Sequence, residues 1–159
     1  MKRALVLLLL VAACGGSGGK AVSPKAAYLA KAEALCVKAN ADVATAKKQQ
    51  PTDIAAVPTY VHSLVDLAKQ TLQEITALTP PSADSADVTT KLLTPLAQQL
   101  ADAEGFAAKI DAAAAKHDTQ QLTSLVFNPP TATRVDLTWM RTYGFKACVT
   151  AANTGATSK

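Results

Sequence analysis

The side chains that could do chemistry in this chain are three cysteines, two histidines and scattered carboxylates. His62 has Asp66 one turn further along a predicted helix, which is the spacing of an ordinary solvent-exposed pair. His117 stands at a predicted turn, and neither histidine has another at three or four residues, as a zinc site on one helix requires. Asp102 and Glu104 are two residues apart, so a helix points them in different directions. We therefore predict no catalytic residue, no metal site, no cofactor and no enzymatic activity.

Cys14 follows a basic start, Lys2-Arg3, and an apolar run over residues 4–13. A membrane-spanning helix needs about 20 apolar residues, so residues 1–13 are predicted to be a signal peptide and not an anchor. The spacer that follows, GGSGGKAVSP, is rich in Gly and Ser. A flexible segment of that length has a root-mean-square reach of roughly 15–20 Å. Residues 14–24 are therefore predicted to be a tether.

The last residues before the spacer, Val11-Ala12-Ala13-Cys14, resemble the lipobox of bacterial lipoproteins. The resemblance implies diacylglycerol on the Cys14 sulfur, cleavage before Cys14, and a further acyl chain on the new amino terminus. Several acyl chains hold a protein stably at a bilayer, whereas one chain holds it only marginally. This predicts a lipid-anchored protein at the outer face of the cytoplasmic membrane. An ordinary secretory signal is the alternative, because the common signal peptidase also accepts small residues.

The other two cysteines are predicted to form a disulfide. Lipid on Cys14 leaves Cys36 and Cys148 as the only pair, and an exported location is oxidising. The bond closes a loop of about a hundred residues, which is worth roughly 4–5 kcal/mol in loop-closure entropy. A reactive thiol is the alternative, and it has only Lys146 as a nearby positive charge.

Apolar residues recur at intervals of three and four along the chain, which is typical of amphipathic helices. The first predicted helix covers residues 25–48, with this inward face: Tyr28, Ala32, Leu35, Cys36, Ala39, Val43 and Ala46. Two more cover 58–78 and 86–116, the latter capped by Ser85 and bent at Pro95. A short helix begins at Asp118, and a last main helix runs from Val135 to Tyr143 before Gly144. The fold is predicted to be all-α: four main amphipathic helices plus one short helix, forming a four-helix bundle over residues 25–148 that one disulfide closes. Residues 149–159 are predicted to be a disordered tail.

The aromatic side chains gather near the C-terminus, at Trp139, Tyr143 and Phe145. One interpretation is that they fill the end of the bundle against Tyr28 and the disulfide. The other is that some face outward as a patch for a partner or lipid, because aromatic anchors dominate interface energetics.

Two stretches, YLAKAEALCVKAN and YGFKAC, resemble the paired ends of a group of small, Ala-rich, single-disulfide helical lipoproteins of high-GC Gram-positive (actinobacterial) bacteria. The likeness covers most of the chain after the signal. It implies lipid on Cys14 and a bridge between Cys36 and Cys148, and it implies no activity because the group has none assigned.

Charge and composition narrow the class of partner. The net charge of +4 falls to +2 when Lys2 and Arg3 leave with the signal, and no basic stripe is interleaved with aromatics. Nucleic acid is therefore not an expected partner. We expect a non-enzymatic envelope lipoprotein whose helices bind another envelope protein. The alternative is a carrier that holds a small apolar or lipid ligand between its helices.

Overall fold

A computed structural model describes residues 21–129 and 134–154, and this part of the chain is helical without a strand. The elements, in order, are α1 (Pro24–Lys48), η1 (Ile54–Ala56), α2 (Val57–Thr76), α3 (Ser85–Val88), η2 (Thr89–Leu93), α4 (Thr94–Ala115), α5 (Thr119–Phe127), α6 (Leu137–Tyr143) and α7 (Ala147–Thr154). The all-α prediction is confirmed. Cys14 and the predicted signal lie outside the described residues.

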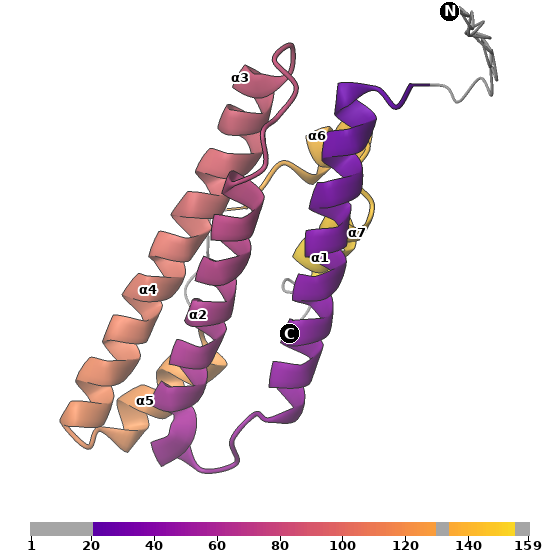
Figure 1. Ribbon diagram of the computed structural model, residues 1–159. Coiled ribbons are helices and arrows are strands. Elements are labelled where there is room, and N and C mark those ends of the chain that lie inside the picture. Colours follow the sequence, from indigo (N-terminus) through magenta and orange to yellow (C-terminus); the bar gives the residue numbers. More distant parts are fainter. Residues whose placement is uncertain (1–20, 130–133, 155–159) are drawn as a thin grey trace, which may run out of the picture.

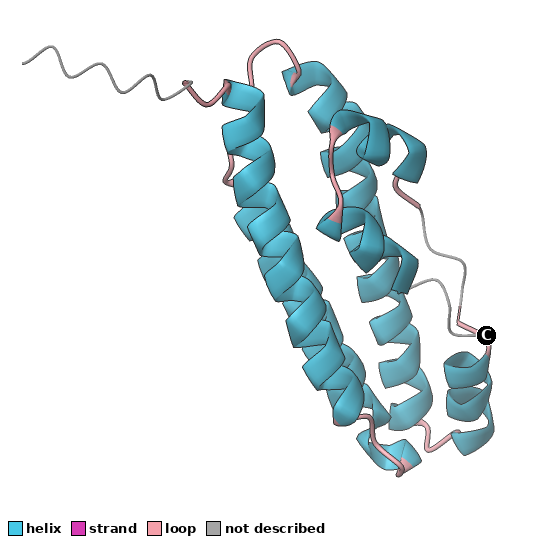
Figure 2. Cartoon of the chain, turned by 90° about the vertical axis from the view of Figure 1, so that its right-hand side faces the viewer, coloured by secondary structure: helices cyan, strands magenta, loops and turns pink. Residues whose placement is uncertain are grey.

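Three long helical segments dominate the architecture (Figures 1 and 2). Helix α2 packs between α1 and α4, and the short loops make neighbouring segments antiparallel (Figure 1). Helix α7 packs on α1, α6 packs on α7, and α5 packs on the C-terminal part of α4 (Figure 1). The predicted four-helix bundle is not confirmed, because α6, expected as the fourth main helix, has only seven residues.

Local sequence signals set the bounds of α1. The Ser23 hydroxyl accepts a hydrogen bond from the Ala26 backbone N–H at 3.2 Å, and Pro24 occupies the first turn, where its missing N–H costs nothing. Lys47 and Lys48 stand in the last turn, where positive charge is favoured by the helix dipole. The predicted helix over 25–48 therefore agrees with the structure to within one residue.

The third helical run differs from its prediction in how it begins. Ser85 is the first residue of α3 and not its cap; Asp84 holds the N-cap position and makes no side-chain capping bond. Its carboxylate instead accepts a hydrogen bond from the Tyr143 hydroxyl at 2.9 Å. A tertiary contact thus takes the group that would otherwise cap the helix.

A π-helical turn, η2, lies just before Pro95 and joins α3 to α4. Proline has no N–H to donate to the carbonyl four residues earlier, so the regular α pattern cannot continue through it. In η2 the Thr94 N–H reaches back five residues to the Thr89 carbonyl. The insertion carries the helical run past the proline and leaves Leu92 buried.

The buried side chains form two separate clusters. The first, here the near core, gathers α1, the end of α2, the α3–η2 segment, α6 and α7; its members are Tyr28, Ala32, Cys36, Ile75, Val88, Leu92, Val135, Met140, Tyr143, Phe145, Cys148 and Val149. The second, the far core, joins the start of α2, the end of α4 and α5; its members are Val57, Ile110, Ala113 and Leu122. No side chain of α1 beyond Cys36 is fully buried, so the predicted inward positions Ala39, Val43 and Ala46 are only half-buried.

The C-terminal part corrects the prediction of a disordered tail from residue 149. Helix α7 continues to Thr154, and Val149 is buried in the near core. The disulfide fixes Cys148 against α1, so the Ala-rich residues that follow begin from an ordered helical turn. Residues 155–159 lie outside the described part.

Candidate functional site

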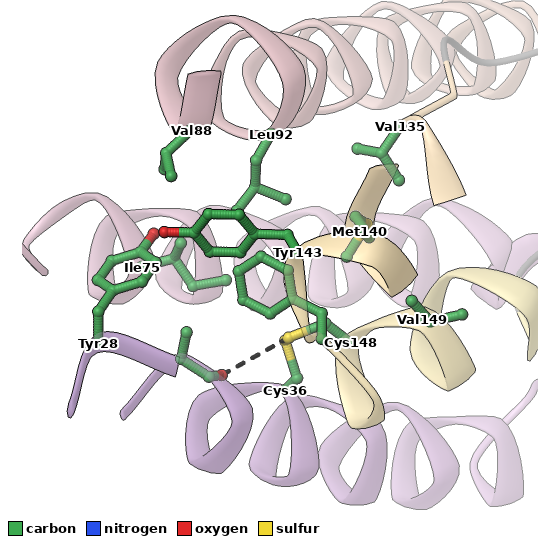
Figure 3. Close-up of a cluster of buried hydrophobic side chains, with 12 residues drawn as sticks. Tyr28, Cys36, Ile75, Val88, Leu92, Val135, Met140, Tyr143, Cys148 and Val149 are labelled. Carbon is green, nitrogen blue, oxygen red and sulfur yellow. Dashed lines mark hydrogen bonds between the residues drawn. A yellow bond between two sulfur atoms is a disulfide. The ribbon is translucent and has the colours of Figure 1, made fainter. Parts of the chain in front are cut away.

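The predicted disulfide between Cys36 and Cys148 is present, with the two Cα atoms 4.9 Å apart. It joins the middle of α1 to the first turn of α7, across a sequence separation of 112 residues. Both cysteines are buried in the near core (Figure 3), so neither is a reactive thiol. The alternative that one of these cysteines is a reactive thiol is therefore excluded.

Glu33 holds the start of α7 beside the disulfide. Its Oε1 accepts a hydrogen bond from the Lys146 N–H at 2.8 Å, and its Oε2 accepts one from the Ala147 N–H at 2.6 Å. The first N–H groups of a helix have no partner within the helix and carry partial positive charge, so a carboxylate there is doubly favourable. Asn40, two turns further along α1, donates from Nδ2 to the Ala147 carbonyl at 3.3 Å.

The C-terminal aromatic residues divide between core and surface. Phe145 is 1% exposed and Tyr143 is 8% exposed, while Trp139 is only partly buried at the edge of the near core. Phe145 packs edge-on against Tyr28, with ring centroids 6.4 Å apart, and Tyr143 stacks on Phe145 at 5.4 Å. The structure thus places two of the three predicted aromatics in the interior.

Two tyrosine hydroxyls lie inside the near core, where Tyr28 and Tyr143 point toward one another (Figure 3). Burial raises the pKa of Tyr143, and its hydrogen bond to the Asp84 carboxylate raises that pKa further. Burial also raises the pKa of Tyr28, whose hydroxyl is buried without a hydrogen-bond partner in the described part of the protein. Both phenols are therefore held in the protonated form over the physiological range.

Lysines flank the aromatic stack on both sides. The Lys25 Nζ lies 3.9 Å from the centre of the Tyr143 ring, and the Lys91 Nζ lies 5.9 Å from the centre of the Trp139 ring. Trp139 and Tyr143 stack on each other with centroids 4.9 Å apart. We call this row of four side chains, Lys25–Tyr143–Trp139–Lys91, the cationic–aromatic ladder. Sequence reasoning missed it because its members come from three elements.

His62 has a different partner from the one that the sequence predicted. The His62 Nε2 lies 2.9 Å and 3.0 Å from the two carboxylate oxygens of Asp111 on α4, so His62 pairs between helices instead of with Asp66 on its own helix. This pair lines an open pocket of about 270 Å³ between α2 and α4, together with the Lys69–Glu104 ion pair. Within the described residues, no group of three or more His, Cys, Asp and Glu side chains is arranged to hold a metal ion.

A second open pocket, of about 220 Å³, lies between the first turns of α1 and the end of α2. Pockets that bury a drug-sized ligand typically measure about 300–1,000 Å³ and are mostly apolar. Both pockets are smaller than that range, and half of the residues that line the 270 Å³ pocket carry charged side chains. Neither of these two pockets therefore supports the carrier alternative.

Phe127, in the last turn of α5, is 79% exposed and is the most exposed large apolar side chain described. Helix α5 lies at the opposite end of the molecule from the start of α1 (Figure 1). The position of Phe127 could have been read from the sequence: Leu122 is buried in the far core, and Phe127 is five residues further on, roughly 140° around the helix.

No protein-family model, no curated protein and no solved structure matches this chain. None of the helices in the described part combines the length and the hydropathy that a bilayer crossing requires.

Proposed function

We propose that this protein is a non-enzymatic lipoprotein of the bacterial cell envelope, anchored by acyl chains on Cys14 at the outer face of the cytoplasmic membrane, and that its helical domain binds another envelope protein. The observation that carries the proposal is the buried Cys36–Cys148 disulfide. Disulfides persist in oxidising, extracytoplasmic compartments. Because this bond consumes two of the three cysteines, Cys14 is left over, in the position where the lipobox-like sequence needs it.

The predicted four-helix architecture is part of this proposal in a modified form. Helices α6 and α7 together span residues 137–154; α7 packs against α1 and α6 packs on α7, and we propose that together they take the place of the fourth helix of a bundle. Gly144, with a φ of 122°, breaks this fourth element into two pieces. We count the pair as the fourth helix of the bundle.

The partner-binding role is supported by the exposed aromatic side chain at the end of the domain remote from the tether. Phe127 is 79% exposed, and aromatic side chains are enriched among the residues that dominate binding energy at protein interfaces. A tethered domain presents its remote end to other envelope proteins, so Phe127 is the contact that we propose.

Lipid anchoring is tested by cell fractionation and mass spectrometry. The wild-type protein is expected in the membrane fraction with acyl chains on Cys14, and Cys14→Ser should move it to the soluble fraction or the medium. A Cys14→Ser protein that still sediments with membranes contradicts the anchor.

The partner role is tested by a photo-crosslinking residue placed at position 127 in intact cells. We expect one crosslinked species that is absent when the same residue replaces Gln121, an exposed position roughly 120° around the same helix from Phe127. Equal crosslinking from both positions, or none from either, refutes the interface at Phe127.

A further inference from the structure

The cationic–aromatic ladder lies at the end of the protein where the tether enters. Lys25 is the second residue of α1, and α1 begins ten residues after Cys14 in the sequence. Helices α3 and α6 lie at this same end (Figure 1). Trp139 and Tyr143 of the ladder belong to α6, and Asp84, the N-cap of α3, accepts a hydrogen bond from the Tyr143 hydroxyl. If Cys14 carries lipid, the tether keeps this end within roughly 15–20 Å of the bilayer, whereas α1 extends for about 37 Å.

The residue types in the ladder are those that occupy the boundary between water and lipid. Trp and Tyr are enriched at membrane interfaces because a ring is apolar while its N–H or O–H stays hydrated, and Lys extends its charge to the headgroups. Trp139 is only partly buried. Val22, just before α1, adds an apolar side chain that is 72% exposed.

The charges at this end favour an anionic surface. Asp87 pairs with the Lys91 Nζ at 3.2 Å, so these two charges offset each other, whereas Asp84 accepts from the neutral Tyr143 hydroxyl and keeps its negative charge. Lys25 lies over the Tyr143 ring, and Lys31 is exposed with no ion pair in the described residues. The three lysines therefore leave a net positive charge over these two carboxylates at the end that the tether brings to the membrane.

We propose that the cationic–aromatic ladder, Lys25–Tyr143–Trp139–Lys91, with Lys31 and Val22 beside it, is a membrane-docking face that rests on the anionic headgroups of the bilayer to which Cys14 is attached. This inference rests on the proposed lipid anchor. It adds an orientation: the near core lies against the membrane, and α5 with Phe127 points away from it. An acyl chain alone leaves the domain free to tumble, whereas a second, electrostatic contact fixes it.

The test uses the mature chain from residue 14 onward with Cys14→Ser, so that no acyl chain contributes to binding. Trp139 is the only tryptophan in the sequence, so its fluorescence reports on the ladder itself. Vesicles of mixed phosphatidylglycerol and phosphatidylcholine should shift its emission to shorter wavelength, and phosphatidylcholine brominated on its acyl chains should quench it. Vesicles of phosphatidylcholine alone should bind at least tenfold more weakly.

Matched variants separate the face from general charge. A lysine near an anionic bilayer contributes about fivefold to the partition coefficient. The triple variant Lys25→Gln, Lys31→Gln, Lys91→Gln should therefore bind the mixed vesicles at least tenfold more weakly, and the corresponding triple Arg variant should bind like wild type. The triple variant Lys48→Gln, Lys109→Gln, Lys116→Gln removes the same charge from the opposite end and should stay within about twofold of wild type.

Two results overturn the docking face: no change in Trp139 emission with the mixed vesicles, or equal weakening in both Gln variants. Failure of the anchor is measured separately, by the mass of Cys14 in the protein from cells. If Cys14 is acylated but the emission of Trp139 does not change with the mixed vesicles, only the docking face is refuted. If Cys14 is not acylated, only the lipid anchor is refuted.

Discussion

The contact that lends itself best to a quantitative test is the one between Glu33 and the start of α7. Replacing Glu33 with Ala removes two acceptors from the Lys146 and Ala147 N–H groups, which lie at 2.8 Å and 2.6 Å. Losing an N-cap acceptor costs about 0.5–2 kcal/mol, and losing a negative charge at a helix N-terminus costs about 0.3–1 kcal/mol more. Lys146 is exposed, so water replaces part of the loss. We expect a decrease of about 1–3 kcal/mol in the free energy of unfolding.

Urea denaturation followed by circular dichroism measures this decrease, and Glu33→Gln should lose less because it keeps one oxygen acceptor. Amide hydrogen exchange adds a local measure: a cost of about 2 kcal/mol corresponds to about 30-fold faster exchange at Lys146 and Ala147 if they exchange by the opening that Glu33 restrains. Exchange in α5, which belongs to the far core, should not change.

Asp42→Ala provides the matched control for Glu33→Ala. Asp42 also lies on α1 and pairs with Lys38, but the pair is exposed, at 51% for the Lys38 side chain and 38% for the Asp42 side chain. Exposed pairs four residues apart are worth about 0.3–0.5 kcal/mol. If Glu33→Ala costs no more than Asp42→Ala, then Glu33 does not hold α7 in place and the argument is wrong.

Three other predictions concern the near core. Gly144→Ala should cost about 1–3 kcal/mol in urea denaturation, because Gly144 has a φ of 122°, whereas Gly105→Ala, in open space within α4, should gain about 0.5–1 kcal/mol. Stability should fall above pH 10, because the unfolded chain then loses the Tyr143 proton at its ordinary pKa of 10.0 while the folded protein, with its raised pKa, retains it. Tyr143→Phe should make that fall shallower by up to about 1.4 kcal/mol per pH unit in pH-dependent denaturation. Replacing Cys36 and Cys148 with Ser should lower the melting temperature and cost roughly 4–5 kcal/mol, and a stability change below about 1 kcal/mol contradicts the loop-closure argument.

The sequence was sufficient wherever a structural signal is local. Ser23 with Pro24 marks the start of α1, and Asp118, where the short helix was predicted to begin, is the N-cap of α5 and accepts from the Gln121 N–H at 2.8 Å. These signals involve residues within one helical turn, so no knowledge of the tertiary fold is needed. The disulfide was also predictable, because counting cysteines left only one pair once Cys14 was assigned.

Two of the errors share one physical cause, which is a tertiary partner that takes the place of a local one. The sequence suggested Asp66 for His62, but the spacing of α2 and α4 brings Asp111 to it instead. Ser85 was predicted as the N-cap, but Asp84 holds that position and accepts a hydrogen bond from the Tyr143 hydroxyl. Periodicity within one helix contains no information on which residue of another helix lies opposite.

The same limit applies to the candidate site. The aromatic concentration at Trp139, Tyr143 and Phe145 was visible in the sequence, but its division into two core residues and one at the edge was not. Lys25 is 114 residues from Trp139 in the sequence, and Lys91 is 48 residues from it. Their approach depends on how α1 and η2 pack against α6, and no local pattern determines that packing.

The distribution of the contacts suggests how the two ends of the domain divide their roles. The disulfide, the Glu33 contact and the Tyr143–Asp84 hydrogen bond all join elements of the near core, while the far core contains no residue of α1. Beyond Cys36, α1 buries no side chain fully, so separating its C-terminal half from α2 loses little buried apolar surface. Local opening follows the elements with the fewest buried contacts. The near core is therefore the more constrained end, as the proposed docking face requires, and the C-terminal half of α1 is the segment that we expect to open most readily.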